Sequence, residues 1–106
     1  MTSIKIFDYT GDFAENKDSA KNLRQTFIEP VLEKKGKITL DFKDVTSATQ
    51  SFIYALISQT IRNFGVDILN EIEFKNCESK VQTIIEIVVD YVQDGIFTED
   101  DDDTTQ

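Results

Sequence analysis

The segment 46–51 concentrates side chains that donate and accept hydrogen bonds at the junction of two predicted elements. It follows an alternating segment and opens a helical pattern, so its hydroxyl groups are placed to accept from the first free N–H groups of a helix. Ser47 or Thr49 is therefore expected to cap that helix. A polar loop at the carboxyl end of a parallel strand is also a common binding region of α/β sheets. The candidate partner-binding residues are Thr46, Ser47, Thr49, Gln50, Ser51 and Tyr54.

Catalytic chemistry is limited by what the composition lacks. The 106 residues include no histidine and one cysteine, which excludes a histidine-based triad, a histidine-ligated zinc site and an internal disulfide. No pair of acidic residues is marked as buried together, so an enzyme with paired carboxylates is only the third alternative. We assign no catalytic residue, no metal ligand and no cofactor, and expect a protein that binds rather than catalyses.

Two further motifs have structural interpretations. The segment 34–37 resembles the end of a phosphate-binding loop, but the first glycine of that loop is absent and Ile38 replaces its hydroxyl residue. Its lysines are expected to close a helix, with Gly36 in the left-handed conformation. Cys77 is expected to be a half-buried packing residue rather than a redox-active thiol.

Charge is distributed unevenly along the chain. There are 20 acidic residues against 11 basic ones, a net charge of -9, and five of the acids are consecutive at 99–103. We interpret residues 1–95 as a single domain and 96–106 as a disordered acidic tail. The acidity argues against direct binding to nucleic-acid phosphates. It leaves one alternative function open: a small acidic, phage-derived inhibitor that mimics nucleic acid and blocks a DNA-binding protein or a nuclease.

The sequence contains no pattern typical of a membrane span or an export signal. The apolar run 84–89 is interrupted by Glu86 and is much shorter than the roughly 20 apolar residues that span a bilayer. The N-terminal residues lack a basic region followed by a long apolar stretch, which argues against a secretion signal. We expect a cytoplasmic protein that does not contact a membrane.

Strand and helix patterns alternate along the chain. Apolar residues at every second position predict three strands, each with one polar face, over 3–8, 37–42 and 71–75. Helical spacing extends from Asp18 or Ser19 to about residue 35, over 50–64, and from Glu78 or Ser79 to Asp94, with a short helical turn at 66–70. Pro30 is expected either to kink the first helix near Thr26 or to begin a second short one.

This order of elements predicts an α/β fold with a small, mostly parallel sheet, because strands separated by helices are joined by crossovers. Strands that each keep a polar face indicate helices on one face only. Right-handed crossovers on a single face step in one direction, which gives strand order 1-2-3 in a two-layer βα superhelix. An exposed sheet edge leaves a homo-oligomer open.

Residues at the end of the second strand and the start of the next helix carry a family resemblance. The pattern consists of Asp41, Phe42, Val45, Ser51 and Phe52, with Asn76 at the end of a later strand. It resembles the STAS-like domain family of unknown function, which is related to the STAS domains of bacterial anti-sigma-factor antagonists. The resemblance covers roughly residues 19–93 and implies a STAS-like fold.

The same resemblance implies a function. It suggests a bacterial, non-enzymatic regulatory module that acts by protein–protein interaction, with an ATP-binding, kinase-like regulator of the anti-sigma type as the candidate partner. In the antagonists, an Asp-Ser-x-Gly motif carries a phosphorylated serine, and here Thr49, Gln50 and Phe52 occupy the Asp, Ser and Gly positions. That switch is therefore not preserved, and Ser51, one residue later, is the candidate phosphorylation site.

Overall fold

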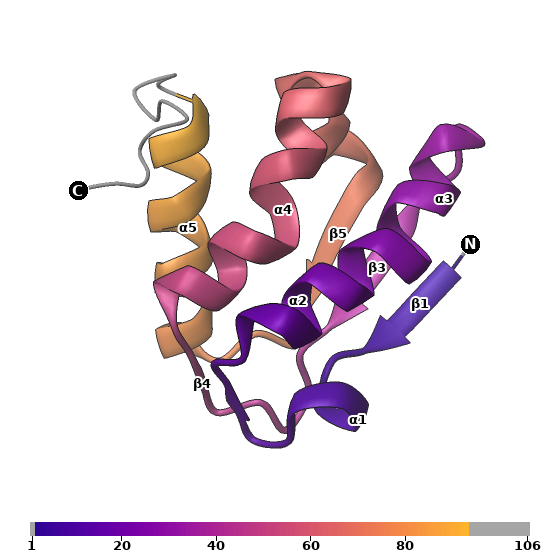
Figure 1. The fold of residues 1–106 in the computed structure, drawn as a ribbon. Coiled ribbons are helices and arrows are strands. Elements are labelled where there is room, and N and C mark those ends of the chain that lie inside the picture. The colour runs from indigo at the N-terminus through magenta and orange to yellow at the C-terminus, as the bar shows by residue number, and fades with distance from the viewer. Residues whose placement is uncertain (1, 94–106) are drawn as a thin grey trace.

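The computed structural model describes residues 2–93 and contains two small parallel sheets (Figure 1). The larger one has three strands in the order β1-β3-β5, and the smaller one pairs β2 with β4. The strands are β1 (Thr2–Lys5), β2 (Phe13–Ala14), β3 (Ile38–Asp41), β4 (Ser47–Ala48) and β5 (Ile72–Lys75). The helices are α1 (Phe7–Thr10), α2 (Lys17–Leu23), η1 (Arg24–Ile28), α3 (Glu29–Glu33), α4 (Gln50–Phe64), η2 (Val66–Glu71) and α5 (Ser79–Gln93).

The alternating residues of the larger sheet divide into a helix-facing side and a polar side. Ile4, Leu40 and Phe74 lie in one register row, and this row faces the helices. On the polar side, Ser3 and Glu73 flank Thr39. Thr39 was predicted to be exposed, but it is only 4% exposed, because these neighbours cover it and its hydroxyl donates to Glu73 over 3.1 Å. The central strand is therefore buried on both faces.

The first strand is shorter than its pattern predicts. It ends at Lys5 rather than at residue 8, and α1 follows directly. The N–H of the fully buried Ile6 still donates to the Asp41 carbonyl at 2.9 Å, whereas the Ile6 carbonyl accepts from the N–H groups of Tyr9 and Thr10. The chain thus curls away from the sheet after a single further strand-like hydrogen bond.

The smaller sheet is the other departure from the predicted strand arrangement. The sequence predicts a single sheet of three strands; in the structure those strands are β1, β3 and β5, in the order β1-β3-β5, and a second sheet, β2-β4, lies apart from them. The small sheet pairs Phe13 with Ser47 and Ala14 with Ala48. Two-residue strands are too short to show a period, which is why the sequence pattern does not mark them.

A layer of helices covers one face of the larger sheet (Figure 1). In that layer α4 packs against α2 on one side and α5 on the other. Its inner side chains, which include Phe52, Ile53, Leu56 and Ile57, are fully buried. Removing apolar surface from water at about 25 cal/mol per Å² is the main stabilising term of such a core.

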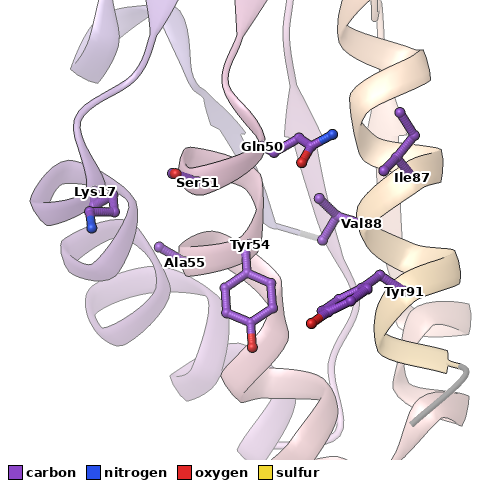
Figure 2. Close-up of a pocket in the computed structure, with 8 residues that line it drawn as sticks. All are labelled: Lys17, Gln50, Ser51, Tyr54, Ala55, Ile87, Val88 and Tyr91. Atoms are coloured by element: carbon purple, nitrogen blue, oxygen red, sulfur yellow. The ribbon is translucent and has the colours of Figure 1, made fainter. Parts of the chain in front are cut away.

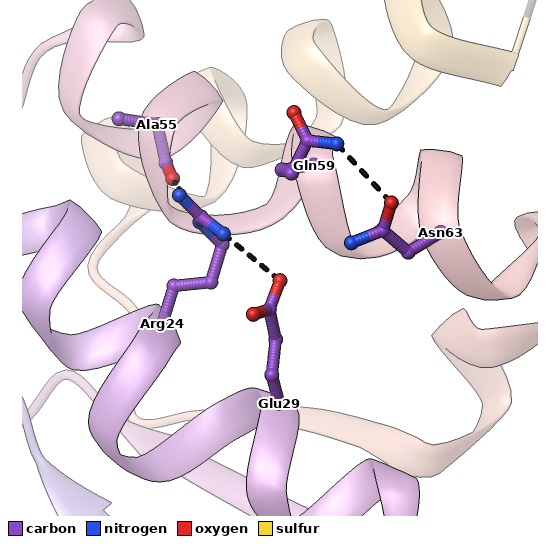
Figure 3. A network of polar contacts seen from close by, with 5 residues as sticks. All are labelled: Arg24, Glu29, Ala55, Gln59 and Asn63. Carbon is purple, nitrogen blue, oxygen red and sulfur yellow. Dashed lines mark hydrogen bonds and ion pairs between the residues drawn. The ribbon is translucent and has the colours of Figure 1, made fainter.

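A polar contact joins the first helical segment to α4. Arg24 donates from Nη1 to Glu29 Oε2 at 2.9 Å and from Nε to the Ala55 carbonyl at 3.3 Å (Figure 3). Both charged side chains are largely buried, at 11% and 17% exposure. Pro30 is the second residue of α3, which directly follows η1, a π-helical turn, so the structure combines the predicted distortion and the second short helix. Proline has no backbone N–H to donate and its ring needs room in the preceding turn, and the wider π-helical turn accommodates both.

Helix ends differ from the predictions at two places. Asn16 caps α2, where Asp18 or Ser19 was predicted, and its side chain accepts from both of their N–H groups. Lys35, rather than Gly36, adopts the left-handed conformation after α3, with φ of 62°. The end of α4 is as predicted. The predicted end of the last helix, Asp94, and the predicted tail 96–106 lie outside the described residues.

Among residues 2–93, none of the helices is both long and apolar enough to cross a bilayer.

Candidate functional site

A groove of about 410 Å³ lies on the outer surface of the helical layer (Figure 2). It follows the first two turns of α4, with α2 on one side and α5 on the other. Its lining residues are Lys17 from α2, Gln50, Ser51, Tyr54 and Ala55 from α4, and Ile87, Val88 and Tyr91 from α5. Three of the six predicted partner-binding residues are thus brought together here.

The start of α4 is held in place from the inside. The Thr49 hydroxyl accepts from the Phe52 N–H at 3.0 Å, and the Thr49 N–H donates to the Ala14 carbonyl of β2 at 3.0 Å. Phe52 is fully buried beneath this turn. Because helical positions one or two residues apart face different directions, burying Phe52 turns Gln50 and Ser51 outward into the groove.

Aromatic and aliphatic side chains form the α5 side of the groove. The rings of Tyr54 and Tyr91 meet edge to face with centroids 6.3 Å apart, and Arg62 donates to the Tyr54 hydroxyl at 2.8 Å. Ile87 and Tyr91 are each 43% exposed. Exposed apolar side chains beside ordered rings are typical of a surface that docks another protein.

The other predicted partner-binding residues do not reach the groove. Thr46 donates from both its N–H and its hydroxyl to the Asp12 carbonyl, at 2.8 and 3.2 Å. Ser47 belongs to β4 and pairs with Phe13. Thr49 is the cap of α4, one of the two expected caps. The loop therefore divides, with its first half fixing the fold and its second half facing outward.

Sequence reasoning missed the lining residues Lys17, Ala55, Ile87 and Val88 as parts of a site. One signal for Ile87 was present, since it lies off the helical stripe of apolar residues that points inward, Val81, Ile84, Ile85, Val88 and Val92, and is one helical turn from Tyr91. Lys17 gives no such signal, because only the packing of α2 against α4 brings it beside Ser51. Ala55 lies one helical turn after Ser51 on α4, so helical spacing alone would have placed it there.

Polar residues also gather at the carboxyl end of the larger sheet, where they bond to each other. The Asp41 carboxylate accepts from the Asn76 side chain and from the Lys43 N–H, each at 2.9 Å. These hydrogen bonds hold the Asp41 pKa below its ordinary value, and the charges of Lys75 and Lys5 act in the same direction. Asn76 has φ of 58°, a left-handed geometry that asparagine tolerates.

Cys77 lies beside this cluster. Burial raises the pKa of its thiol, and the negative charge of Asp41 adds to the effect. Both influences favour the protonated thiol, the opposite of an activated thiolate. In the described part of the chain, no group of three histidine, cysteine, aspartate or glutamate side chains is arranged to hold a metal ion.

The lining of the groove is suited to binding. Apolar surface from Ile87, Val88 and the two tyrosines lies beside the neutral polar groups of Gln50 and Ser51. Lys17 adds one positive charge at the α2 side. This combination can bury an apolar side chain of a partner while hydrogen bonds fix its orientation.

Comparison with known proteins places the fold in a family. No curated protein and no solved structure matches the chain. Residues 19–82, more than half of the chain, match the family model described as a STAS-like domain of unknown function (DUF4325). The match includes α2 from residue 19 onward, the central strand, the whole of α4 and the α4 side of the groove. The chain therefore belongs to the STAS-like domain family.

Proposed function

We propose that this protein is a non-enzymatic STAS-like regulatory module that binds a protein partner in the groove between α4 and α5. The observation that carries the proposal is that three predicted partner-binding residues at the start of α4 line one groove with exposed side chains of α5. They are Gln50, Ser51 and Tyr54, and the α5 side chains are Ile87 and Tyr91. Family membership supports a regulatory role, and the apolar groove with a polar margin supports docking of a protein.

The candidate partner is an ATP-binding, kinase-like regulator of the anti-sigma type. Ser51 is the proposed phosphate acceptor, because its side chain is exposed in the first turn of α4 and lines the groove. A phosphate at that position would add about two negative charges near a helix N-terminus. Phosphorylation would then change the charge of the docking surface without disturbing the core beneath it.

The proposal includes a finer description of the fold. We infer that β1, β3 and β5, with the helices between them, form a short right-handed βα superhelix, the arrangement expected for parallel strands that step in one direction. The parallel pairing of β1 with β3 and of β3 with β5 supports this description.

The nucleic-acid mimic gains no support from the described residues. A mimic needs an extended surface of one sign, and on the polar side of the sheet Lys5 and Lys75 flank Asp41 in one register row. Mixed charge of this kind is typical of a solvated surface.

The test is affinity capture from the native host with two variants of matched chemistry. Ile87→Asp places a charge in the groove, and Val66→Asp makes the same change at an equally exposed apolar residue of η2, since the two are 43% and 42% exposed. We expect at least a tenfold loss of the captured partner with Ile87→Asp alone, measured by quantitative mass spectrometry. Equal capture by both variants and the unaltered protein would overturn the proposal.

A further inference from the structure

The β5 edge of the larger sheet is a second surface, separate from the groove on the helices. In the order β1-β3-β5, β5 is an edge strand, and among residues 2–93 no strand pairs with its outer side. The chain crosses the sheet one strand at a time, with helical segments after each strand, and α5 follows β5. Within the described range no further strand follows α5. In a repeating βα pattern, the next strand would lie beside β5 and under α5.

Two adjoining hollows mark that place. One of about 360 Å³ lies between β5 and α5, and the next, of about 430 Å³, continues toward Cys77. Both are lined by Phe74 and Ile85, and the first also by Ile72 and Val89. Phe74 and Val89 are only half-buried, so apolar surface remains accessible along the edge. We call this surface the β5 groove.

The backbone of β5 is oriented to receive a strand. The Lys75 carbonyl accepts from the Phe42 N–H of the central strand at 2.8 Å, so Lys75 faces inward. Backbone direction alternates along a strand, which turns the N–H and carbonyl of Phe74 and the carbonyl of Ile72 toward the outer edge. The Ile72 N–H is already used, because it donates to the Leu69 carbonyl. Outward backbone groups and groove-lining side chains thus come from the same two residues.

The charge of the β5 groove indicates which kind of segment it would attract. The two carboxylate side chains that line the hollows, Glu86 and Asp90 of α5, are exposed, and the Cys77 thiol beside them is held in its neutral form by a raised pKa. They lie one helical turn apart along the same side of the groove. A segment with acidic side chains would be repelled there, whereas lysine or arginine side chains would be attracted.

We propose that the β5 groove binds an extended basic segment of a partner protein by strand addition. The segment would bond to the outward groups of Ile72 and Phe74, place apolar side chains at alternate positions between β5 and α5, and direct lysine or arginine toward Glu86 and Asp90. This surface is separate from the proposed partner groove, which uses Ile87, Val88 and Tyr91 of the same helix. Two surfaces would let the module hold two proteins at once.

The test is titration of the isotope-labelled full chain with two synthetic nine-residue peptides, one alternating valine with lysine and the other valine with glutamate. The lysine peptide should shift the amide signals of β5 and of Val89, and should slow hydrogen exchange at the Phe74 N–H. The glutamate peptide should bind at least tenfold more weakly. Equal binding of both peptides, or shifts centred on Gln50 and Tyr54, would overturn the proposal.

Two double variants separate the local charge from the net charge. Glu86→Lys with Asp90→Lys should weaken binding of the lysine peptide at least tenfold. Asp12→Lys with Glu33→Lys changes the net charge equally at exposed sites on other elements, and should weaken it less than threefold. Similar losses in both would assign the binding to net charge and contradict a specific site. Ile87→Asp should leave peptide binding unchanged, so failure here and failure of the proposed function are distinguishable.

Other occupants of the groove have their own signatures. A dimer that forms at rising concentration in sedimentation and is lost with Glu86→Lys and Asp90→Lys would show that a second copy fills the groove. Slow exchange at the Phe74 N–H without peptide, lost on deletion of residues 94–106, would show that the chain fills its own groove. Either result would overturn the proposal of a basic partner segment.

Discussion

The carboxyl end of the larger sheet and the outer surface of α4 and α5 are both candidate binding regions, and they use their polar residues in opposite ways. At the sheet end, Asp41 and Asn76 are bonded to each other within the chain. On the helices, Gln50 and Ser51 are exposed in a groove. Polar side chains at a strand end therefore do not by themselves mark a site. The function is better sought where the fold leaves side chains to the solvent.

This comparison makes a sharp prediction about Asn76, the largest effect we expect outside the core. Asn76→Ala removes the hydrogen bond to Asp41 and places a β-carbon at φ of 58°, so it should cost about 2 kcal/mol of unfolding free energy. Asn76→Gly relieves the backbone and should cost about half as much. Urea denaturation measures both.

Partner capture completes the test of the sheet end. Once corrected for the folded fraction, capture by the Asn76 variants should equal that of the unaltered protein. A variant that stays folded and loses its partner would show that the sheet end takes part in binding, and the distinction between the two regions would fail.

Much of the fold could be predicted from the sequence, because its longer elements have clear periods. The three main strands and the helix ending before Gly65 follow from apolar spacing and from a glycine that adopts φ of 90°. The cap of α2 was predicted at Asp18 or Ser19 but is Asn16, because all three residue types can cap a helix and the sequence does not distinguish them. The two-residue strands β2 and β4 gave no signal at all.

The groove was only half predictable. Gln50, Ser51 and Tyr54 could be found because they follow a strand end and begin a helix. Lys17 and Ile87 each lie more than 30 residues in sequence from Gln50, Ser51 and Tyr54, and only tertiary packing brings them to α4. The family resemblance, now supported by the match over 19–82, identified the fold but not these neighbours.

Thr49 gives the next prediction, of intermediate size. Thr49→Ala removes the side-chain acceptor for the Phe52 N–H and should cost about 1 kcal/mol. Thr49→Ser keeps the acceptor and serves as the matched control, with a loss below about 0.5 kcal/mol. Thermal denaturation followed by circular dichroism measures the difference. Equal stability of the two variants would mean that the hydroxyl is not the cap.

We expect Asp41 to make a smaller contribution to the unfolding free energy, and this contribution depends on pH. Its pKa is lower in the folded chain than in the unfolded one, so its contribution is fully present above about pH 4 and is lost as the pH falls through the folded value. The contribution should be below about 1 kcal/mol, because the carboxylate lies near solvent. Urea midpoints of the unaltered protein and Asp41→Asn should differ above pH 4 and converge below it. A difference that does not change down to pH 2 would contradict the assigned cause.

The smallest change in stability is expected at Ser51, and this position gives the most direct test of the comparison between the sheet end and the helical surface. Ser51→Asp and Ser51→Ala should each alter the unfolding free energy by less than about 0.5 kcal/mol, because the side chain is exposed. Ser51→Asp should nevertheless lower affinity for the captured partner at least fivefold, since it places a carboxylate in the groove. Ser79→Asp is the control, because it makes the same change at an exposed serine in the first turn of α5, outside the groove. If both aspartate variants weaken the partner equally, added charge alone is responsible and Ser51 has no special place. If only Ser51→Asp does so, the outward half of the loop is the binding surface and a phosphate there can regulate it.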